Sequence, residues 1–242
     1  MKKQPAATII IALYTLSAFL FSSCHKIVGE GPVNTETRVV SSFTGIVLKV
    51  PGNLYYTEDA TQKLELRAQQ NILDEIETVV SGNNVEIRFK HHNTSIGKHD
   101  VINIYAASPA INNLEIKGSG NLYATLPIHP SSIRLAVDGS GNVQVNQLIA
   151  GNIDASISGS GNIIVNSGSS NSSQARISGS GYIDLLGMEA KTGRAEISGS
   201  GTIKLFLQQT LDAYISGSGT VLYKGSPIVN SSISGSGSVK KL

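Results

Sequence analysis

The chain has 242 residues, with 19 lysines and arginines, 17 aspartates and glutamates, and a single cysteine. One cysteine excludes a disulfide within the chain and any zinc or redox site built from several cysteines. A formal charge of +2 lacks the basic excess of nucleic-acid binders, so we expect no nucleic-acid partner.

The N-terminal 23 residues have the pattern of a bacterial export signal. Lys2 and Lys3 precede an apolar run over Ile9–Phe21, which is too short to span a bilayer as a helix. The segment ends in LFSSC, and a cysteine at this place resembles the lipobox of bacterial lipoproteins, where it is lipidated and begins the mature chain. We therefore predict a lipoprotein signal peptide over 1–23 and a lipid anchor on Cys24. The alternative is an ordinary signal peptide cut elsewhere, with Cys24 incidental.

Removal of this signal would leave 17 basic and 17 acidic residues, because it holds two lysines and no acid. The next segment, HKIVGEGPVNTETR, is polar and contains Gly and Pro, so we interpret residues 24–38 as a tether between lipid and folded body. Because CHKIVGE has no strong acidic cluster directly after the cysteine, we place the anchored protein at the outer membrane, on its periplasmic side.

Residues 39–117 alternate like β-strands but without a fixed period. TQKLELRA and NNVEIRFK alternate polar and apolar residues, and NILDEIE (71–77) fits either one helical turn or a bulged strand. KVPGNLYYTED (49–59) looks like a diverged copy of KGSGNLYATLP (117–127). We predict longer, less regular β-rungs that cap the N-terminal end of a repeat structure.

A histidine-rich segment, HHNTSIGKHD, lies in this region and brings His91, His92 and His99 close together in sequence. Histidine is a common ligand of transition metals. The segment also has the composition of a polar loop between strands predicted at 84–90 and 101–106, and adjacent histidines on a strand would point to opposite faces. We favour the loop, and we predict neither a metal site nor another cofactor.

From residue 118 onward the chain repeats a Gly-Ser-Gly unit. The units begin 21, 20, 20, 20, 18 and 18 residues apart, at positions 118, 139, 159, 179, 199, 217 and 235. A unit of this size cannot bury an apolar face alone and must stack on its neighbours, as in a solenoid. The period predicts a parallel β-helix with one rung per repeat over 118–242, and 39–242 as one continuous domain.

Positions within the repeat divide between two faces. Counted from the first glycine, positions −4, −2, +4 and +6 are mostly apolar, whereas the odd positions are mostly polar or charged. Side chains alternate along a strand, so the even set should face a core and the odd set solvent. Both glycines take even positions, and we expect them inside the corner, where a side chain has no room and where glycine permits positive φ. These turn glycines are Gly118, Gly120, Gly139, Gly141, Gly159, Gly161, Gly179, Gly181, Gly199, Gly201, Gly217, Gly219, Gly235 and Gly237.

The serine between the glycines and the residue after each corner should form two outward files along the solenoid, in which like residues can hydrogen-bond to one another. Their small, uncharged side chains predict a flat interaction face, while Lys240 and Lys241 protect the open edge of the last rung. We expect this face to mediate homo-oligomerisation or to bind a protein or glycan partner. Its residues are Ser119, Asn121, Ser140, Asn142, Ser160, Asn162, Ser180, Tyr182, Ser200, Thr202, Ser218 and Thr220.

With the corners aligned, the sequence resembles the family called putative auto-transporter adhesin, head GIN domain. The resemblance rests on FTGIVLKVPGNLYYTE and on the serial GSGN and GNI units, and it covers about residues 39–240. It implies a right-handed, pectin-lyase-like β-helix with an adhesive or structural role. The family has no established catalytic residues, so the resemblance assigns none here.

The acids of the repeats form no catalytic cluster in the sequence pattern, apart from a pairing of Asp154 and Asp212, which share an offset on distant rungs. We therefore predict a non-catalytic, adhesin-like or structural lipoprotein of the cell envelope. The alternative is a glycan-binding or glycan-active β-helix enzyme with its site in 39–117, which a cleft with paired carboxylates would support.

Overall fold

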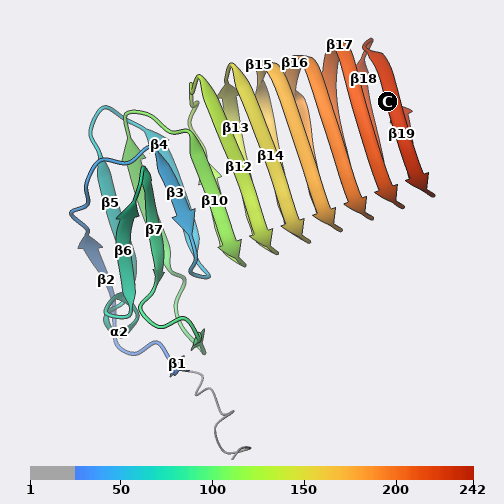
Figure 1. Ribbon diagram of the computed structural model, residues 1–242. Helices are drawn as coiled ribbons and strands as arrows, with labels where there is room; N and C mark the ends of the chain where they lie inside the picture. The colour runs from blue at the N-terminus through green and yellow to red at the C-terminus, as the bar shows by residue number, and fades with distance from the viewer. Residues whose placement is uncertain (1–24) are drawn as a thin grey trace, which may run out of the picture.

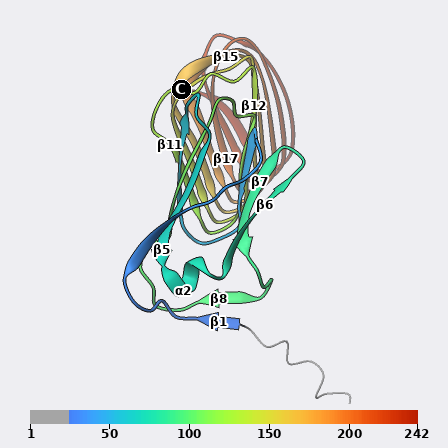
Figure 2. The same ribbon diagram turned by 90° about the vertical axis from the view of Figure 1, so that its left-hand side faces the viewer.

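The computed structural model describes residues 25–242, and most of this range is β-strand. Figure 1 shows the strands stacked as successive rungs of a solenoid, and the view from the N-terminal end shows a flattened oval cross-section (Figure 2). The helix α2 (Gln70–Leu73) has a single turn. Within the described residues, no helix has the length and apolar character needed to cross a membrane. The predicted all-β solenoid is confirmed.

The regular part of the solenoid is a ladder of parallel strands in which equivalent corners lie in register. Gly159 pairs with Gly139 on one side and with Gly179 on the other, and the same pairing continues to Gly217 and Gly235. The strands are β10 (Asn113–Gly118), β11 (Asn121–Ala124), β12 (Ser132–Gly139), β13 (Asn142–Ile149), β14 (Asn152–Gly159), β15 (Asn162–Gly179), β16 (Tyr182–Gly199), β17 (Thr202–Gly217), β18 (Thr220–Gly225), β19 (Ile228–Gly235) and β20 (Ser238–Lys241).

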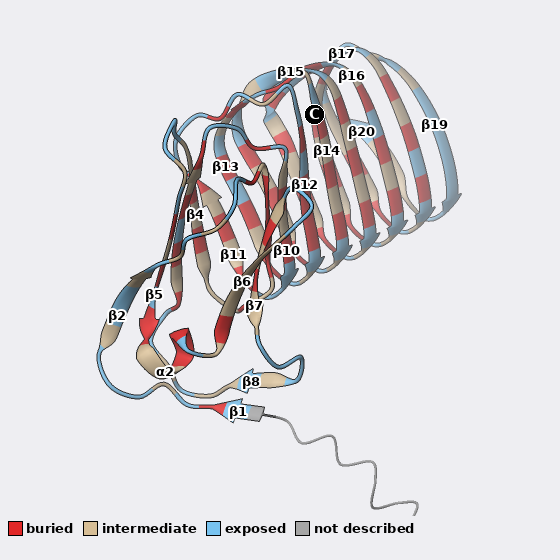
Figure 3. Ribbon diagram, turned by 60° about the vertical axis from the view of Figure 1, so that its left-hand side comes forward, coloured by how far each residue is buried: buried red, intermediate tan, exposed pale blue. Residues whose placement is uncertain are grey.

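The even positions of the repeat form the core, as the alternation predicts. Ile177 and Ile197, two residues before their corners, are 2% and 3% exposed, and the stacked alanines two residues earlier are fully buried. Buried and solvent-facing bands alternate along every inner rung (Figure 3). At the last rung the equivalent Ile233 is 42% exposed, because no further rung among the described residues lies over β19. Each rung is therefore buried by its neighbours rather than by its own residues.

The corner glycines are of two kinds, which corrects the expectation that both lie inside. The second glycine, such as Gly181, is buried, but the first glycine, such as Gly179, is partly exposed. The first glycines have φ between +121° and +129°, a region that other residues rarely adopt. A Cβ on Gly179 would lie 2.4 Å from the carbonyl oxygen of Gly159 on the preceding rung. Positive φ and backbone contact between rungs, rather than burial, thus require the first glycine.

The N-terminal rungs follow an order that differs from the order of the chain. β3 (Gly45–Leu48) and β4 (Asn53–Glu58) form one rung, and β7 (Asn84–Phe89) and β9 (Asn103–Ser108) form another. The first of these rungs lies between the second and the β10–β11 rung, pairing in parallel on both sides. The register places Asn53 beside Asn121, as the alignment of 49–59 with 117–127 predicts.

Antiparallel strands cover the outer side of these rungs. β5 (Lys63–Gln69) pairs with β9, β6 (Ile76–Ser81) pairs with β7, and β2 (Val33–Thr37) pairs with β5. Residues 71–77 form the end of helix α2 followed by the start of β6, so the helical alternative is correct for the first half of this segment. Ile72 and Leu73 of this turn are fully buried in the core.

The predicted tether is wrong for residues 25–38, which are part of the folded cap. β1 (His25–Ile27) pairs in parallel with β8 (Thr94–Ile96), and β2 adds to the edge of β5. Ile27 is buried, and the Arg38 guanidinium donates to the Leu73 carbonyl at 3.0 Å. Polar composition concealed these strands because they pair along an edge and bury few side chains. Residues 1–24, with the predicted signal peptide and Cys24, lie outside the described residues.

Substitution at the two middle positions of one corner should separate the roles of glycine and serine. Gly179→Ala should lower the free energy of unfolding by about 2–5 kcal/mol, because it forces a positive φ on alanine and a contact with the preceding rung. Ser180→Ala should lower it by less than about 1 kcal/mol, because this side chain is exposed. Urea unfolding followed by circular dichroism measures both values, and equal losses would contradict this account of the corner.

Candidate binding surfaces of the solenoid

The predicted serine file lies on the outside of the corner. Ser119, Ser140, Ser160, Ser180, Ser200 and Ser218 are all exposed. Their backbones hold the rungs together, since the Ser180 N–H donates to the Gly159 carbonyl at 2.9 Å and the Ser200 N–H donates to the Gly179 carbonyl at 2.9 Å. From Ser140 to Ser218, each serine thus joins two rungs through its backbone and presents its side chain to solvent.

The asparagines after the corners form a hydrogen-bonded ladder. Nδ2 of Asn162 donates to Oδ1 of Asn142 at 2.6 Å, and Asn142 donates in the same way to Asn121 at 2.8 Å. The ladder continues into the cap, where Asn121 donates to Asn53 at 3.0 Å and Asn53 reaches Asn103 at 3.5 Å. Asn53 and Asn103 were not among the predicted face residues, although the match of KVPGN to KGSGN indicates Asn53.

The ladder changes character at Tyr182, which is the first residue of this file that is not asparagine. Its hydroxyl donates to the Asp184 carboxylate at 2.5 Å, and Lys204 of the next rung lies 5.1 Å from its ring centroid. Desolvation by burial, together with the hydrogen bond to Asp184, raises the pKa of the Tyr182 phenol. Thr202 and Thr220 continue the file on the following rungs. The face is therefore a continuous file whose chemistry differs between its two halves.

A second serine file, absent from the predicted sites, runs along the other side of the first glycines from Gly159 onward. It occupies the position just before that glycine, and its members are exposed: Ser158, Ser178, Ser198, Ser216 and Ser234. The repeated ISGSG motif contains this serine, so the second file could have been predicted from the sequence. The two files and the glycine between them make a strip of small residues along the corner.

Charged side chains alternate on the strands that lead to the corners. Asp154 lies 3.5 Å from a guanidinium nitrogen of Arg176 and 4.0 Å from one of Arg134. Asp212, three rungs further along, accepts a hydrogen bond from the Asn230 amide at 2.9 Å. The suggested pairing of Asp154 with Asp212 is therefore wrong, because the intervening rungs separate these carboxylates.

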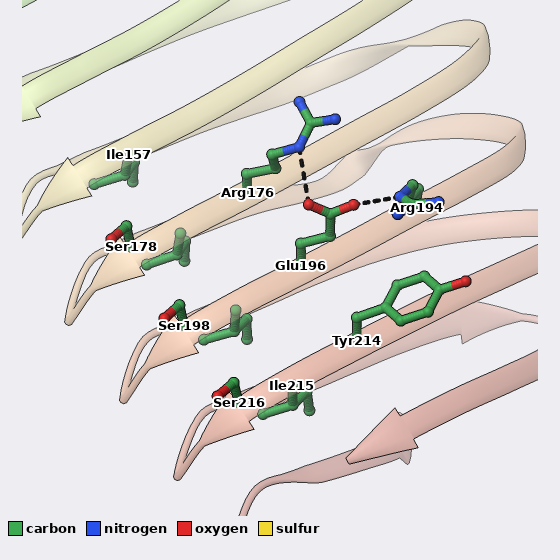
Figure 4. Close-up of a pocket in the computed structure, with 11 residues that line it drawn as sticks. Ile157, Arg176, Ser178, Arg194, Glu196, Ser198, Tyr214, Ile215 and Ser216 are labelled. Carbon is green, nitrogen blue, oxygen red and sulfur yellow. Dashed lines mark hydrogen bonds and ion pairs between the residues drawn. The ribbon is translucent and has the colours of Figure 1, made fainter. Parts of the chain in front are cut away.

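The same strands hold a shallow groove with a volume of about 450 Å³, shown in Figure 4. Ser178, Ser198 and Ser216 border it on the side of the corner. The opposite side, the wall of the groove, consists of Arg176, Glu196, Tyr214 and Arg194, and four buried isoleucines form the floor between the two sides. The Arg176 Nε donates to one Glu196 oxygen at 3.0 Å, and Arg194 donates to the other oxygen.

The charged side chains of the groove hold one another in place because the Glu196 carboxylate accepts hydrogen bonds from two guanidinium groups. Desolvation by burial opposes ionisation of Glu196, but the hydrogen bonds and charges of Arg194 and Arg176 exceed it and lower the pKa of this carboxyl. Arg194 also lies over the Tyr214 ring, with its guanidinium carbon 4.6 Å from the ring centroid. These contacts hold four polar or aromatic side chains in one arrangement at the solvent surface.

Two hollows of the cap bear on the alternative of a catalytic site. One, of about 280 Å³, is lined by Lys49, Arg88, His91 and His92 among others, and no carboxylate lines it. The other, of about 210 Å³, contains one carboxylate, Glu58, near His129. In neither hollow do two carboxylates face each other.

The histidines of 91–99 lie in the segment that joins β7 to β9 and includes β8. His91 Nε2 lies 4.0 Å from a Glu75 carboxylate oxygen, and His99 Nδ1 contacts the Asp100 carbonyl oxygen at 2.5 Å. Over residues 25–242, no three His, Cys, Asp or Glu side chains gather closely enough to hold a metal ion. The predicted polar loop thus contains a short strand, β8.

Comparison with known proteins assigns the fold to a family. Residues 42–227 match the family described as "Putative auto-transporter adhesin, head GIN domain". The chain belongs to this family. The resemblance inferred from the corners is thus confirmed, and the family name indicates an adhesin-like protein of the cell envelope. No curated protein matches the chain.

Solved structures agree on the fold. A putative adhesin from Bacteroides fragilis superimposes with a TM-score of 0.82 at 24% identity, covering 89% of this chain and 100% of its own. A putative lipid binding protein from Parabacteroides distasonis has a TM-score of 0.76 at 26% identity, covering 90% and 99%. A putative adhesin from the same organism has a TM-score of 0.71 at 22% identity, covering 90% and 100%.

The lowered pKa of Glu196 predicts how its contribution to stability depends on pH. A carboxyl whose pKa is lower in the folded state stabilises the fold above its unfolded pKa of about 4.3, and the contribution is lost as pH falls through the folded pKa. The difference in Tm between the wild type and Glu196→Gln should therefore be largest near neutral pH and shrink below about pH 4. Thermal unfolding across this range measures it, and a difference independent of pH would contradict the ion-pair account.

Proposed function

We propose that the protein is a non-catalytic, lipid-anchored adhesin-like solenoid of the cell envelope, acting through the ladder face of serines and asparagines defined above. The observation that carries this proposal is the continuity of that face. Exposed serines repeat on successive rungs beside a file of asparagines whose amides are ordered by one another. A rigid array of this kind suits recognition of an extended surface.

A binding role is favoured over the catalytic alternative by the chemistry of the cap. Glycoside hydrolysis commonly needs two carboxyl groups on either side of the scissile bond. The hollow beside His91 and His92 is lined by basic and apolar groups, and the one beside His129 offers only Glu58 as an acid. The family and the solved relatives that are described as adhesins point in the same direction.

Self-association is the interaction that the ladder face fits best. The strip along the corner carries no charge from Ser158 to Ser160, and the same holds at the equivalent positions of the next three rungs. Charged or long side chains would hold a second copy away from such a strip. A second copy could approach this strip closely because neither copy presents a long side chain. A foreign protein or glycan with a flat surface is the alternative partner.

The anchor proposed on Cys24 would orient the solenoid. β1 begins at the next residue and lies on the capped end, while β19 lies at the opposite end (Figure 1) and β20 lies beside it in the last rung (Figure 3). A lipid at Cys24 therefore places the cap against the membrane and the ladder face along the length that extends from it. We place the protein on the periplasmic side of the outer membrane, as expected from the sequence after the cysteine.

Substitution of the anchor residue tests this placement. Cys24→Ala should shift the protein from the membrane fraction to the soluble fraction, because it removes the thiol that lipidation requires and leaves the folded cap unchanged. Fractionation followed by mass spectrometry of the N-terminal peptide measures both the location and the lipid. A variant that stays in the membrane with unchanged processing would show that the anchor is elsewhere.

Disulfide trapping tests self-association through the ladder face. In the full chain purified in detergent, oxidation of Ser180→Cys should link two copies, since this position would face its equivalent across the interface. Adding Ser160→Arg and Ser200→Arg should abolish the link through like-charge repulsion and bulk, with the circular dichroism spectrum unchanged. Denaturing electrophoresis without reductant measures the dimer.

The matched control for this experiment is Val39→Cys, an almost fully exposed position in the cap. It should form little dimer under the same conditions. Equal trapping at both positions, or none at Ser180→Cys at high protein concentration, would argue against self-association through this face.

A further inference from the structure

We propose that the groove of Figure 4 is a binding site for a neutral saccharide chain that lies along the solenoid axis. The groove occupies the strands before the corner and shares with the strip along the corner only the serines that precede the first glycines, whereas the ladder face begins after those glycines. This inference therefore goes beyond the proposed function and does not depend on self-association.

The dimensions of the groove follow from the rung geometry. Ser178, Ser198 and Ser216 repeat along the axis at the strand spacing of about 4.8 Å. The wall residues Arg176, Glu196 and Tyr214 lie two residues before these serines along their strands. At about 3.4 Å per residue, the wall and the serines are therefore roughly 7 Å apart. The length that an extended hexose chain gains per sugar is similar to the strand spacing of about 4.8 Å, so successive sugars would meet equivalent serine hydroxyls. The width suits one pyranose ring.

The wall offers the contacts by which proteins recognise sugars. Arg194 covers one face of the Tyr214 ring, but the residue is 42% exposed, so the uncovered part of the ring is available to the C–H face of a pyranose. Glu196 accepts from two guanidinium groups, which fixes planar donors and acceptors beside that ring. Such planar groups can hydrogen-bond two adjacent sugar hydroxyls at once. An aromatic platform next to fixed planar polar groups is therefore in place before a ligand arrives.

The charges around the groove favour a neutral ligand. The groove is lined by two guanidinium groups and one carboxylate, those of Arg176, Arg194 and Glu196. A second carboxylate, that of Asp154 on the preceding rung, lies 3.5 Å from Arg176 and balances the remaining positive charge. The groups lining the groove are already paired, so an anionic or cationic ligand would have to displace a partner. Neutral hydroxyls can add hydrogen bonds without breaking these pairs.

Other ligand classes fit the groove less well. A peptide could not add as a strand here, because β16 is paired in parallel with β15 on one side and with β17 on the other. The floor of the groove is lined by Ile157, Ile177, Ile197 and Ile215, but each is at most 3% exposed, so little of this apolar surface is available to an acyl chain. A polyhydroxylated chain is the ligand that uses both the serine side and the Arg–Glu–Tyr wall.

The test is binding of the full chain, purified in detergent, to an array of neutral polysaccharides comprising a β-glucan, a mannan, a galactan and a xylan. The affinity for the saccharide that binds is then measured by calorimetry with its soluble oligomer. Ser198→Arg, which fills the groove, and Tyr214→Ala, which removes the ring, should each weaken binding by about tenfold or more. Affinity should change little between low and high salt, because no net charge drives it.

Matched controls lie close by in the chain. Ser200→Arg introduces the same side chain on the other side of Gly199, and Tyr105→Ala removes a comparably exposed ring in the cap. Both variants should bind the saccharide like the wild type. Because Ser200→Arg also perturbs the ladder face, it separates a loss of self-association from a loss of saccharide binding. Absence of binding to all four polysaccharides, equal losses in Ser198→Arg and Ser200→Arg, or binding that collapses in salt would each overturn the proposal.

Discussion

The structure depends on the distance between the backbones of successive corners. Parallel strands stack so closely that, from Gly139 onward, the Cα of each first glycine faces the carbonyl oxygen of the glycine one rung earlier, where a Cβ would lie 2.3–2.5 Å away. That carbonyl accepts the N–H of the following serine at 2.9–3.0 Å. The turn needs a positive φ and the stack needs an absent side chain, and glycine satisfies both. The files of side chains on either side are equally spaced because the corners are equally spaced.

The regular part of this fold can be read from the sequence because each rung repeats one set of local requirements. The apolar residues at even offsets, the glycine at the corner and the polar residues between them all point to the same arrangement, and the register of the strands agrees with it. The first glycine is the exception. Simple alternation places it inside, but the positive φ that it adopts rotates the chain and moves it to the surface.

The cap and the groove were harder to predict because they depend on contacts between distant segments. Residues 25–38 have a polar composition typical of a linker, yet their backbone completes the edges of β5 and β8. The groove unites Arg176, Glu196 and Tyr214, which come from three rungs with no shared motif. These three residues come together only when the repeats are aligned at the position three residues before each first glycine. That position has no single residue type across the rungs, so no motif identifies it.

The interleaved order of the N-terminal rungs has a consequence for how the chain acquires its fold. The rung of β3 and β4 has one neighbour that ends at residue 108 and another that ends at residue 124, so it cannot gain both partners until that length of chain is available. Closing these long loops first is entropically expensive, whereas each later rung closes only one short repeat onto a finished surface. Pairing should thus begin more readily among the regular rungs, whose contacts are local, and the interleaved cap should form more slowly.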